Sequence, residues 1–192
     1  MILSRKGGWA ECWGDNQYGQ LGNGSQAQRL PPVDVSDLNA IKQISAGKNH
    51  TCALTESGGV KCWGYNEYGQ LGNGSRVRSS LPVDVPGLNA IKQISGGRDH
   101  TCALTELGNV KCWGDNSFGQ LGDGSQADRS TPVDVPGLTA IKQISAGGLH
   151  TCALTESGDV KCWGANVYGQ IGVDLGSERF SLRPMELPFR LN

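Results

Sequence analysis

Histidine, cysteine and tryptophan recur at fixed positions along this chain, and each of these residue types could do chemistry. The set returns every fifty residues, and its first full copy is His50, Cys52, Cys62 and Trp63. Histidine is a natural general base, paired cysteines form disulfides or hold metal ions, and tryptophan offers a flat face to a ligand. A period this long and regular indicates one supersecondary unit copied in series, so the unit must be understood first.

The copy that spans 41–90 predicts four short strands and no helix. Its apolar residues alternate over short runs, and glycine, asparagine and proline separate these runs. Pro82 begins the last run, which fits an edge strand, because proline cannot donate a hydrogen bond to a neighbouring strand. The four predicted strands are IKQISAG (41–47), HTCALT (50–55), GVKCWG (59–64) and LPVDV (81–85).

The two central strands form a predicted hairpin. A three-residue turn over 56–58 places glycine at Gly58, where a positive φ is needed. This turn fixes which residues lie opposite each other, and like residues then share each face. The predicted pairs are Leu54 with Val60, Cys52 with Cys62, and Thr51 with Trp63.

Four antiparallel strands per unit predict an all-β fold built from the blades of a β-propeller. A β-solenoid is the alternative, but solenoid coils are usually shorter and lack a tight hairpin. We expect a single repeat domain over 1–192, with about 50 residues per blade and roughly 3.75 blades. The predicted units are a partial blade at 2–35, which lacks its initial strand, and blades at about 41–85, 91–135 and 141–187.

The repeated pattern GxxHTCALTxxGxVxCWGxNxxGQLG resembles the repeat of the regulator-of-chromosome-condensation family, in particular its cysteine-bearing bacterial branch. The resemblance covers nearly the whole chain and implies a β-propeller, which has seven blades in typical members. Known members include a nucleotide-exchange factor that acts on a small GTPase while bound to chromatin, a β-lactamase inhibitor protein and bacterial surface proteins. The resemblance therefore implies a fold but does not select a function.

The six cysteines of the three full units are predicted to form one disulfide per blade, because directly opposed hairpin residues lie within disulfide range. Disulfides imply an oxidising compartment, so we expect an extracellular or cell-surface location, although no signal peptide is visible. Cys12 is expected to be free, because isoleucine occupies position 2, where its partner would fall. The alternatives are buried free thiols, and a metal site that lacks a recurring fourth ligand. The predicted bonds are Cys52–Cys62, Cys102–Cys112 and Cys152–Cys162.

We interpret the periodic histidines and tryptophans as scaffold. A catalytic site is one constellation, whereas His50, His100 and His150 occur once per unit, without a serine or carboxylate in a triad-like arrangement. Each histidine is expected to tie a strand end to the neighbouring blade. Each tryptophan lies opposite a threonine in the hairpin and is expected to pack between blades. We therefore expect no enzyme activity, no metal and no cofactor.

The positions that change between copies are the candidate binding residues. The units 41–90 and 91–140 agree at 35 of 50 positions, and their differences concentrate in turns and in the loop after the hairpin. Recognition is usually built on loops of a rigid scaffold, and loop aromatics often anchor interfaces. Neutral drift at exposed positions is the alternative. The candidates are Lys48, Asn49, Tyr65, Glu67, Tyr68, Arg76, Arg78, Arg98, Asp99, Phe118 and Tyr168.

Composition and blade number limit the possible partners. The 17 basic and 18 acidic residues form no basic stripe, so we expect no nucleic acid partner. No apolar run is long enough for a membrane span, so we expect no membrane insertion. Incomplete blades leave open sheet edges, so we expect a homodimer that closes one ring. The variable loop positions lead us to expect recognition of an unidentified protein. The alternatives are a purely structural self-assembling protein, a fragment of a longer propeller and a guanine-nucleotide-exchange regulator.

Overall fold

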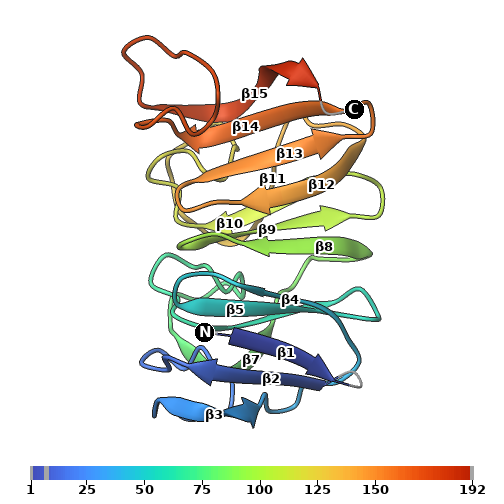
Figure 1. The fold of residues 1–192 in the computed structure, drawn as a ribbon, viewed down its shortest axis with the longest axis vertical. Coiled ribbons are helices and arrows are strands. Elements are labelled where there is room, and N and C mark those ends of the chain that lie inside the picture. Colours follow the sequence, from blue (N-terminus) through green and yellow to red (C-terminus); the bar gives the residue numbers. More distant parts are fainter. Residues whose placement is uncertain (1, 7–8, 191–192) are drawn as a thin grey trace.

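The computed structural model describes residues 2–6 and 9–190, which form four antiparallel sheets. The sheets follow one another in chain order along the long axis, from the N-terminal sheet at the bottom of Figure 1 to the C-terminal sheet at its top. The predicted all-β fold with four-stranded blades is therefore confirmed, and we number the sheets as blades 1 to 4. Within the described ranges, no helix is long and apolar enough to cross a membrane.

Blade 1 has three strands and each later blade has four, always paired with their neighbours in sequence. Blade 1 consists of β1 (Ile2–Lys6), β2 (Trp9–Gly14) and β3 (Arg29–Asp34). Blade 2 consists of β4 (Ile41–Ala46), β5 (His50–Thr55), β6 (Val60–Gly64) and β7 (Ser79–Asp84). Blade 3 consists of β8 (Ile91–Gly96), β9 (His100–Thr105), β10 (Val110–Gly114) and β11 (Arg129–Asp134). Blade 4 consists of β12 (Ile141–Ala146), β13 (His150–Thr155), β14 (Asp159–Ala165) and β15 (Phe180–Arg190).

The central hairpin has the predicted register in all three complete blades. Strands β5 and β6 form every predicted pair, from Leu54–Val60 to Thr51–Trp63, and the two later hairpins repeat the pattern. Gly58 has the expected positive φ, at 83°. The predicted outer strand is also present as β7 at the blade edge, but it begins two residues before the expected run.

Blade 1 departs from the expected pairing. Cys12 lies opposite Leu3 and not opposite position 2, because only two residues separate β1 from β2, whereas four separate β5 from β6. The shorter connection shifts the pairing by one residue. Cys12 is unbonded, as predicted, and fully buried. Burial raises the pKa of the Cys12 thiol to about 12, so this thiol stays protonated at neutral pH.

All three predicted disulfides are present, as Cys52–Cys62, Cys102–Cys112 and Cys152–Cys162. Each joins the two central strands of a complete blade, where the Cα atoms of the paired residues are 4.1 Å apart. The free-thiol and metal alternatives therefore do not describe this structure, because the sulfur atoms are bonded to each other.

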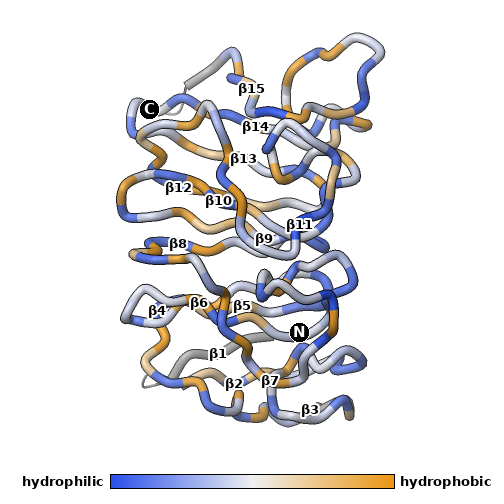
Figure 2. The backbone as a smooth tube through the Cα atoms, turned by 180° about the vertical axis from the view of Figure 1, so that it is seen from behind, coloured by the Kyte–Doolittle hydropathy of each residue, from blue (hydrophilic) through white to orange (hydrophobic). Residues whose placement is uncertain are grey.

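The apolar cores lie between the blades. One core combines Cys52, Leu54 and Val60 of blade 2 with Ile94 and Trp113 of blade 3. Equivalent clusters join blade 1 to blade 2 and blade 3 to blade 4. Figure 2 shows hydrophobic and hydrophilic segments interspersed along the backbone of every blade. The expected packing of tryptophan between blades is confirmed, since Trp113 and its counterparts in blades 2 and 4 are fully buried.

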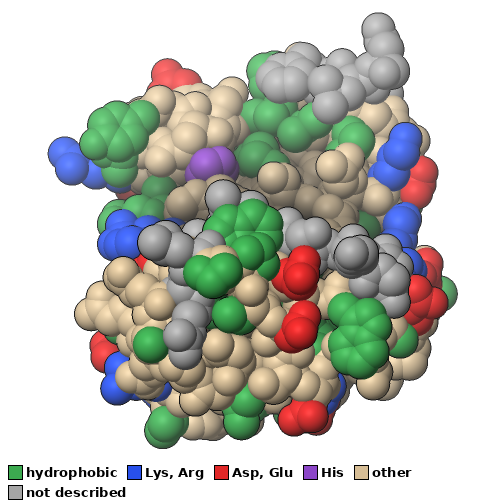
Figure 3. Space-filling view, turned by 60° about the horizontal axis from the view of Figure 1, so that its bottom comes forward, with side chains coloured by type: hydrophobic (Ala, Val, Ile, Leu, Met, Phe, Trp, Pro, Cys, Tyr) green, Lys and Arg blue, Asp and Glu red, His purple; other side chains and the backbone are tan. Residues whose placement is uncertain are grey.

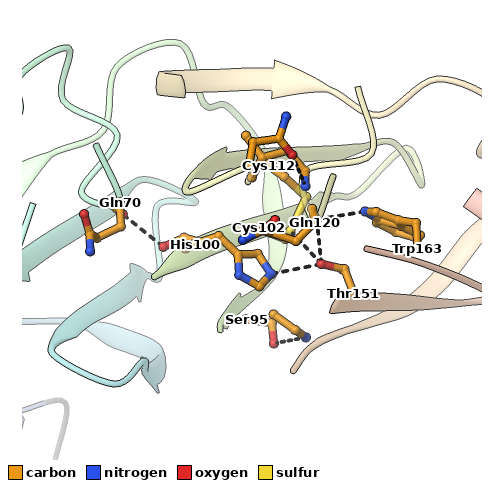
Figure 4. The surroundings of a disulfide bond; sticks show 12 residues. Gln70, Ser95, His100, Cys102, Cys112, Gln120, Thr151 and Trp163 are labelled. Carbon is orange, nitrogen blue, oxygen red and sulfur yellow. Dashed lines mark hydrogen bonds between the residues drawn. A yellow bond between two sulfur atoms is a disulfide. The ribbon is translucent and has the colours of Figure 1, made fainter. Parts of the chain in front are cut away.

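A chain of hydrogen bonds joins each blade to the next. The indole N–H of Trp113 donates to the carbonyl oxygen of Gln70 at 2.9 Å, and the Thr101 hydroxyl donates to the same oxygen at 3.0 Å. His50 Nε2 lies 2.9 Å from that hydroxyl. Because the hydroxyl proton already points to Gln70, His50 must donate from Nε2, which fixes its tautomer. Figure 4 shows the equivalent bonds of His100 with Thr151 and of Trp163 with Gln120.

The innermost strand of each blade also holds the next blade. The Gln43 side chain donates to the Ile94 carbonyl oxygen and accepts from the Ile94 N–H, both at 2.9 Å. The Ser45 hydroxyl accepts from the Gly96 N–H at 2.9 Å. Blades 3 and 4 repeat these bonds through Gln93 and Ser95. The periodic polar residues thus make the hydrogen bonds between adjacent blades, as expected for residues of the scaffold.

The buried histidines predict a loss of stability in mild acid. Burial, reinforced by the neighbouring histidine, lowers the pKa of His50 and of His100 to about 3, whereas an unfolded histidine titrates near 6.5. Unfolding therefore takes up protons between pH 6.5 and 3. The contribution of the two histidines to the free energy of unfolding is fully present above pH 6.5 and is lost as the pH decreases. Together they give a slope of up to about 3 kcal/mol per pH unit.

Urea denaturation of the wild-type chain and of His100→Gln across this pH range measures the effect. The variant should lose about half of the slope attributed to the two histidines, whatever its stability at neutral pH. Equal slopes for both proteins would show that His100 does not titrate on unfolding. Carboxylates titrate in both proteins alike, so the difference between the two slopes isolates the histidine.

Candidate binding site on the loop face

A pocket of about 170 Å3 lies where the loops of blades 1 and 2 meet. One wall comes from the loop after β2, and the rest comes from the loop between β6 and β7. This pocket gathers four of the predicted binding residues with one aromatic that was not among them. The lining residues are Tyr18, Tyr65, Glu67, Arg76 and Arg78.

A buried asparagine gives the β6–β7 loop its fixed shape. The Asn66 side chain donates to the carbonyl oxygens of Ser75 and Val77 at 3.1 and 2.9 Å, and accepts from the Leu71 N–H at 2.9 Å. Asn66 is fully buried, and Asn16 occupies the same position in blade 1. The loop therefore has a constant base on which the variable side chains are displayed. The sequence shows this asparagine in every unit, but its spacing alone does not reveal its hydrogen bonds.

Three tyrosines form a row across the two blades. The ring centroids of Tyr18 and Tyr65 are 4.8 Å apart in an edge-to-face arrangement, and those of Tyr65 and Tyr68 are 6.2 Å apart. The Tyr65 hydroxyl donates to Glu67 Oε2 at 2.7 Å. Burial, followed by this hydrogen bond, raises the pKa of Tyr65, so the phenol remains a donor at neutral pH. The aromatic row is thus held in one orientation.

The two arginines of the pocket have different surroundings. Arg76 Nη1 donates to the Glu67 carbonyl oxygen at 3.1 Å and lies 3.5 Å from an Asp128 carboxylate oxygen in blade 3. These two contacts hold Arg76 in place. Arg78 makes no hydrogen bond or ion pair with any residue of the described ranges. Its guanidinium is therefore available to a ligand, for which it offers a planar set of donors.

Blade 2 lacks, at this pocket, a side-chain hydrogen bond that blade 1 has at the equivalent position. In blade 1, Asp15 stands where blade 2 has Tyr65, and Asp15 accepts from Gln20 Nε2 at 3.0 Å. In blade 2 the equivalent Gln70 contacts Asp99 of the next blade instead, at 3.4 Å. Burial raises the pKa of Asp99, against the opposing effect of Arg98. Tyr65 therefore replaces a residue with a structural role, and it adds an aromatic wall to the pocket.

The remaining candidates do not join this pocket. Lys48 and Asn49 follow β4, and Arg98 and Asp99 follow β8. Of these four, Asp99 is buried and belongs to the contact with Gln70.

The candidates Phe118 and Tyr168 lie on later blades. The ring of Phe118 in blade 3 packs near Phe180, with ring centroids 6.4 Å apart. Tyr168 in blade 4 is 91% exposed. Phe118 and Tyr168 therefore lie apart from the row that Tyr18, Tyr65 and Tyr68 form on blades 1 and 2.

The pocket is small, and its lining is aromatic and charged. Its volume is below the range of about 300–1,000 Å3 typical of sites for drug-sized ligands, and it suits a single side chain. Tyrosine and arginine are enriched among the residues that dominate protein interfaces. Among the described residues, no three His, Cys, Asp or Glu side chains gather to hold a metal ion.

Four-stranded blades that pack face to face through the same residues define a protein built from propeller repeats. The RCC1-like domain family matches residues 1–190, so the chain belongs to this family. The ultraviolet-B receptor UVR8 of Arabidopsis thaliana is 42% identical over 53 residues, which are 27% of this chain and 12% of that protein.

Two solved structures extend the comparison. Prp20p from Saccharomyces cerevisiae is 26% identical, with a TM-score of 0.78 over 94% of this chain and 48% of its own. The ectodomain of the receptor kinase CR4 from Physcomitrella patens is 29% identical, with a TM-score of 0.55 over 91% of this chain and 41% of its own. The chain thus spans less than half the length of each of these relatives.

Proposed function

We propose that this chain is a non-enzymatic propeller scaffold for protein–protein recognition and that the pocket on the loop face is its contact site. One observation carries the proposal. Of the first three blades, only blade 2 has an aromatic or charged residue at all four positions equivalent to 65, 67, 76 and 78, and the fold gathers these four residues with Tyr18. A periodic scaffold does not require this cluster, whereas an interface anchor does.

The relatives support recognition as a general role. The Prp20p structure is described together with its binding to Gsp1p and histones, and the CR4 structure is the ectodomain of a receptor kinase. We also propose an extracellular or cell-surface location and membership of the cysteine-bearing bacterial branch. The disulfide in each complete blade supports both proposals, and the ectodomain relative supports the first.

Capture with matched baits tests the recognition proposal. Immobilised wild-type chain is compared with the double variant Tyr65→Ala/Arg78→Glu and with Tyr168→Ala, which removes an exposed loop aromatic on blade 4. A protein retained by wild type and by Tyr168→Ala should bind the double variant at least about tenfold more weakly, as expected when interface anchors are lost. Equal retention of every captured protein by all three baits would contradict a role for the pocket.

We further propose that two copies associate and complete one ring. Cys152, Leu154 and Val160 of blade 4 are partly exposed, whereas their counterparts in blades 2 and 3 are buried by the following blade. This chain spans less than half of the length of each of these relatives, so two copies together have about the length of one relative. A purely structural, self-assembling role is the alternative, and the loop variant distinguishes the two because assembly alone does not need Tyr65 or Arg78.

A further inference from the structure

We infer that Trp13 of one copy packs on Gly172 of a second copy and donates its indole N–H to the Gln170 carbonyl oxygen. The inference rests on the proposed self-association and names the surfaces that meet. It repeats, between two copies, the contact that joins neighbouring blades within one chain.

Each internal interface places a tryptophan directly over a glycine of the preceding blade. A Cβ atom at Gly22 would lie 2.6 Å from Trp63 Nε1, and one at Gly72 would lie 2.6 Å from Trp113 Nε1. The indole needs this close approach to reach the carbonyl oxygen two residues earlier, at 2.9 Å in each case. The glycine, the carbonyl oxygen and the incoming tryptophan thus form one recurring joint, which we call the tryptophan joint.

Blade 4 presents its half of the tryptophan joint at the surface. Gly172 has a φ of 71°, the backbone conformation of its counterparts, which have values between 72° and 76°. Gly172 is exposed and Gln170 is half-buried, whereas the equivalent residues of blades 1 to 3 are buried. The side chain nearest to Gly172 is Leu187 of the same blade. On the same face, Cys152, Leu154 and Val160 help to line a pocket of about 180 Å3.

Blade 1 presents the other half. Trp13 is partly exposed, whereas the tryptophans of blades 2, 3 and 4 are fully buried. Its indole N–H makes no hydrogen bond to any residue in the described part of the chain. Figure 3, which brings the N-terminal end forward, shows hydrophobic side chains interspersed with polar ones on this surface. Of the four tryptophans that recur with the repeat, Trp13 on blade 1 is the one that is partly exposed, and blade 4 has an exposed glycine of the kind that such a tryptophan covers.

Because the two halves lie on different blades, the contact is head to tail. Two copies can then make two equal contacts and close, which avoids the open filament that an unclosed head-to-tail contact produces. The contact covers only part of the blade face. Blade 1 has no strand equivalent to β4, so it cannot offer the backbone groups that Gln43 and Gln93 bind in the next blade. Gln143 is therefore expected to lie outside the contact.

Light scattering of single variants and of their mixture tests the inference. Trp13→Ala removes the inserted side chain, and Val160→Lys places a charge on the receiving face. Each variant alone should have the mass of one chain at micromolar concentration, while Gln143→Ala, the control, assembles like wild type. An equimolar mixture of the two variants should form a heterodimer, because one of the two contacts remains possible. Trp13 of the chain with Val160→Lys can still pack on the unaltered blade 4 of the chain with Trp13→Ala.

The outcomes separate the inference from the proposals on which it rests. If wild type assembles and Trp13→Ala assembles equally, self-association stands and the tryptophan contact is wrong. If wild type assembles but the mixed variants stay monomeric, the head-to-tail arrangement is wrong. Circular dichroism of each variant shows whether it is folded, and heterodimer formation by two variants would itself show that both retain their structure. The capture experiment on the loop face is independent of all these results.

Discussion

Replacing Trp113 with alanine is expected to lower the free energy of unfolding by about 4 kcal/mol, the middle of the range for large aromatic residues in cores. Trp113 is fully buried between blades 2 and 3 and belongs to the same cluster as Leu54 and Val60. The substitution also removes the hydrogen bond to Gln70, which leaves a buried carbonyl oxygen with one donor fewer. Chemical denaturation of the wild-type and variant proteins measures the loss.

Trp13→Ala is the matched control, because it makes the same change at the equivalent position of blade 1, the first of the four described sheets. In dilute protein, where copies are separate, the loss should be about 1 kcal/mol, the usual size for a partly exposed site. A similar loss for both variants would mean that the tryptophans contribute through their own hairpins. The packing between blades would then not be the main source of stability.

Removing the disulfide of blade 3 with the double variant Cys102→Ala/Cys112→Ala is expected to cost about 3 kcal/mol. The bond closes a short loop, with a sequence separation of 10, and it constrains the unfolded chain accordingly. Both cysteines are also fully buried in the core between blades 3 and 4, so their loss leaves unfilled space. Denaturant midpoints of the wild-type and variant proteins provide the measurement.

Alkylation followed by mass spectrometry establishes the redox state on which this prediction depends. Denatured but unreduced protein should take up one label, at Cys12, whereas reduced protein should take up seven. Seven labels without reduction would establish the free-thiol alternative, and the stability cost of the double variant would then reflect packing alone.

The blade itself could be predicted because its determinants are local. The length of the turn at 56–58 sets the register of the hairpin, and this register brings Cys52 opposite Cys62. The same reasoning misplaced the partner of Cys12, because the connection in blade 1 is shorter and repeat numbering cannot be carried across it. Local sequence also indicated that the tryptophans and histidines contact the neighbouring blade, since both recur at the same positions of the hairpin in successive units.

The pocket could be predicted only in part, because variation between copies does not show which side chains meet. Tyr18 was absent from the candidates, since its partner Tyr65 lies 47 positions away and only the stacking of blades brings the two rings together. Asp99 was a candidate because it varies, yet it is buried and serves the contact with Gln70. A change between copies can therefore mark a substituted scaffold contact as well as a binding residue.

The mass of the wild-type chain in solution tests most directly whether its exposed blade faces are association surfaces. Light scattering at micromolar concentration is predicted to give twice the 20.3 kDa mass of one chain. In the proposed closed pair, Trp13 of each copy packs on the face around Gly172 of the other. A mass of one chain throughout this concentration range would contradict the account.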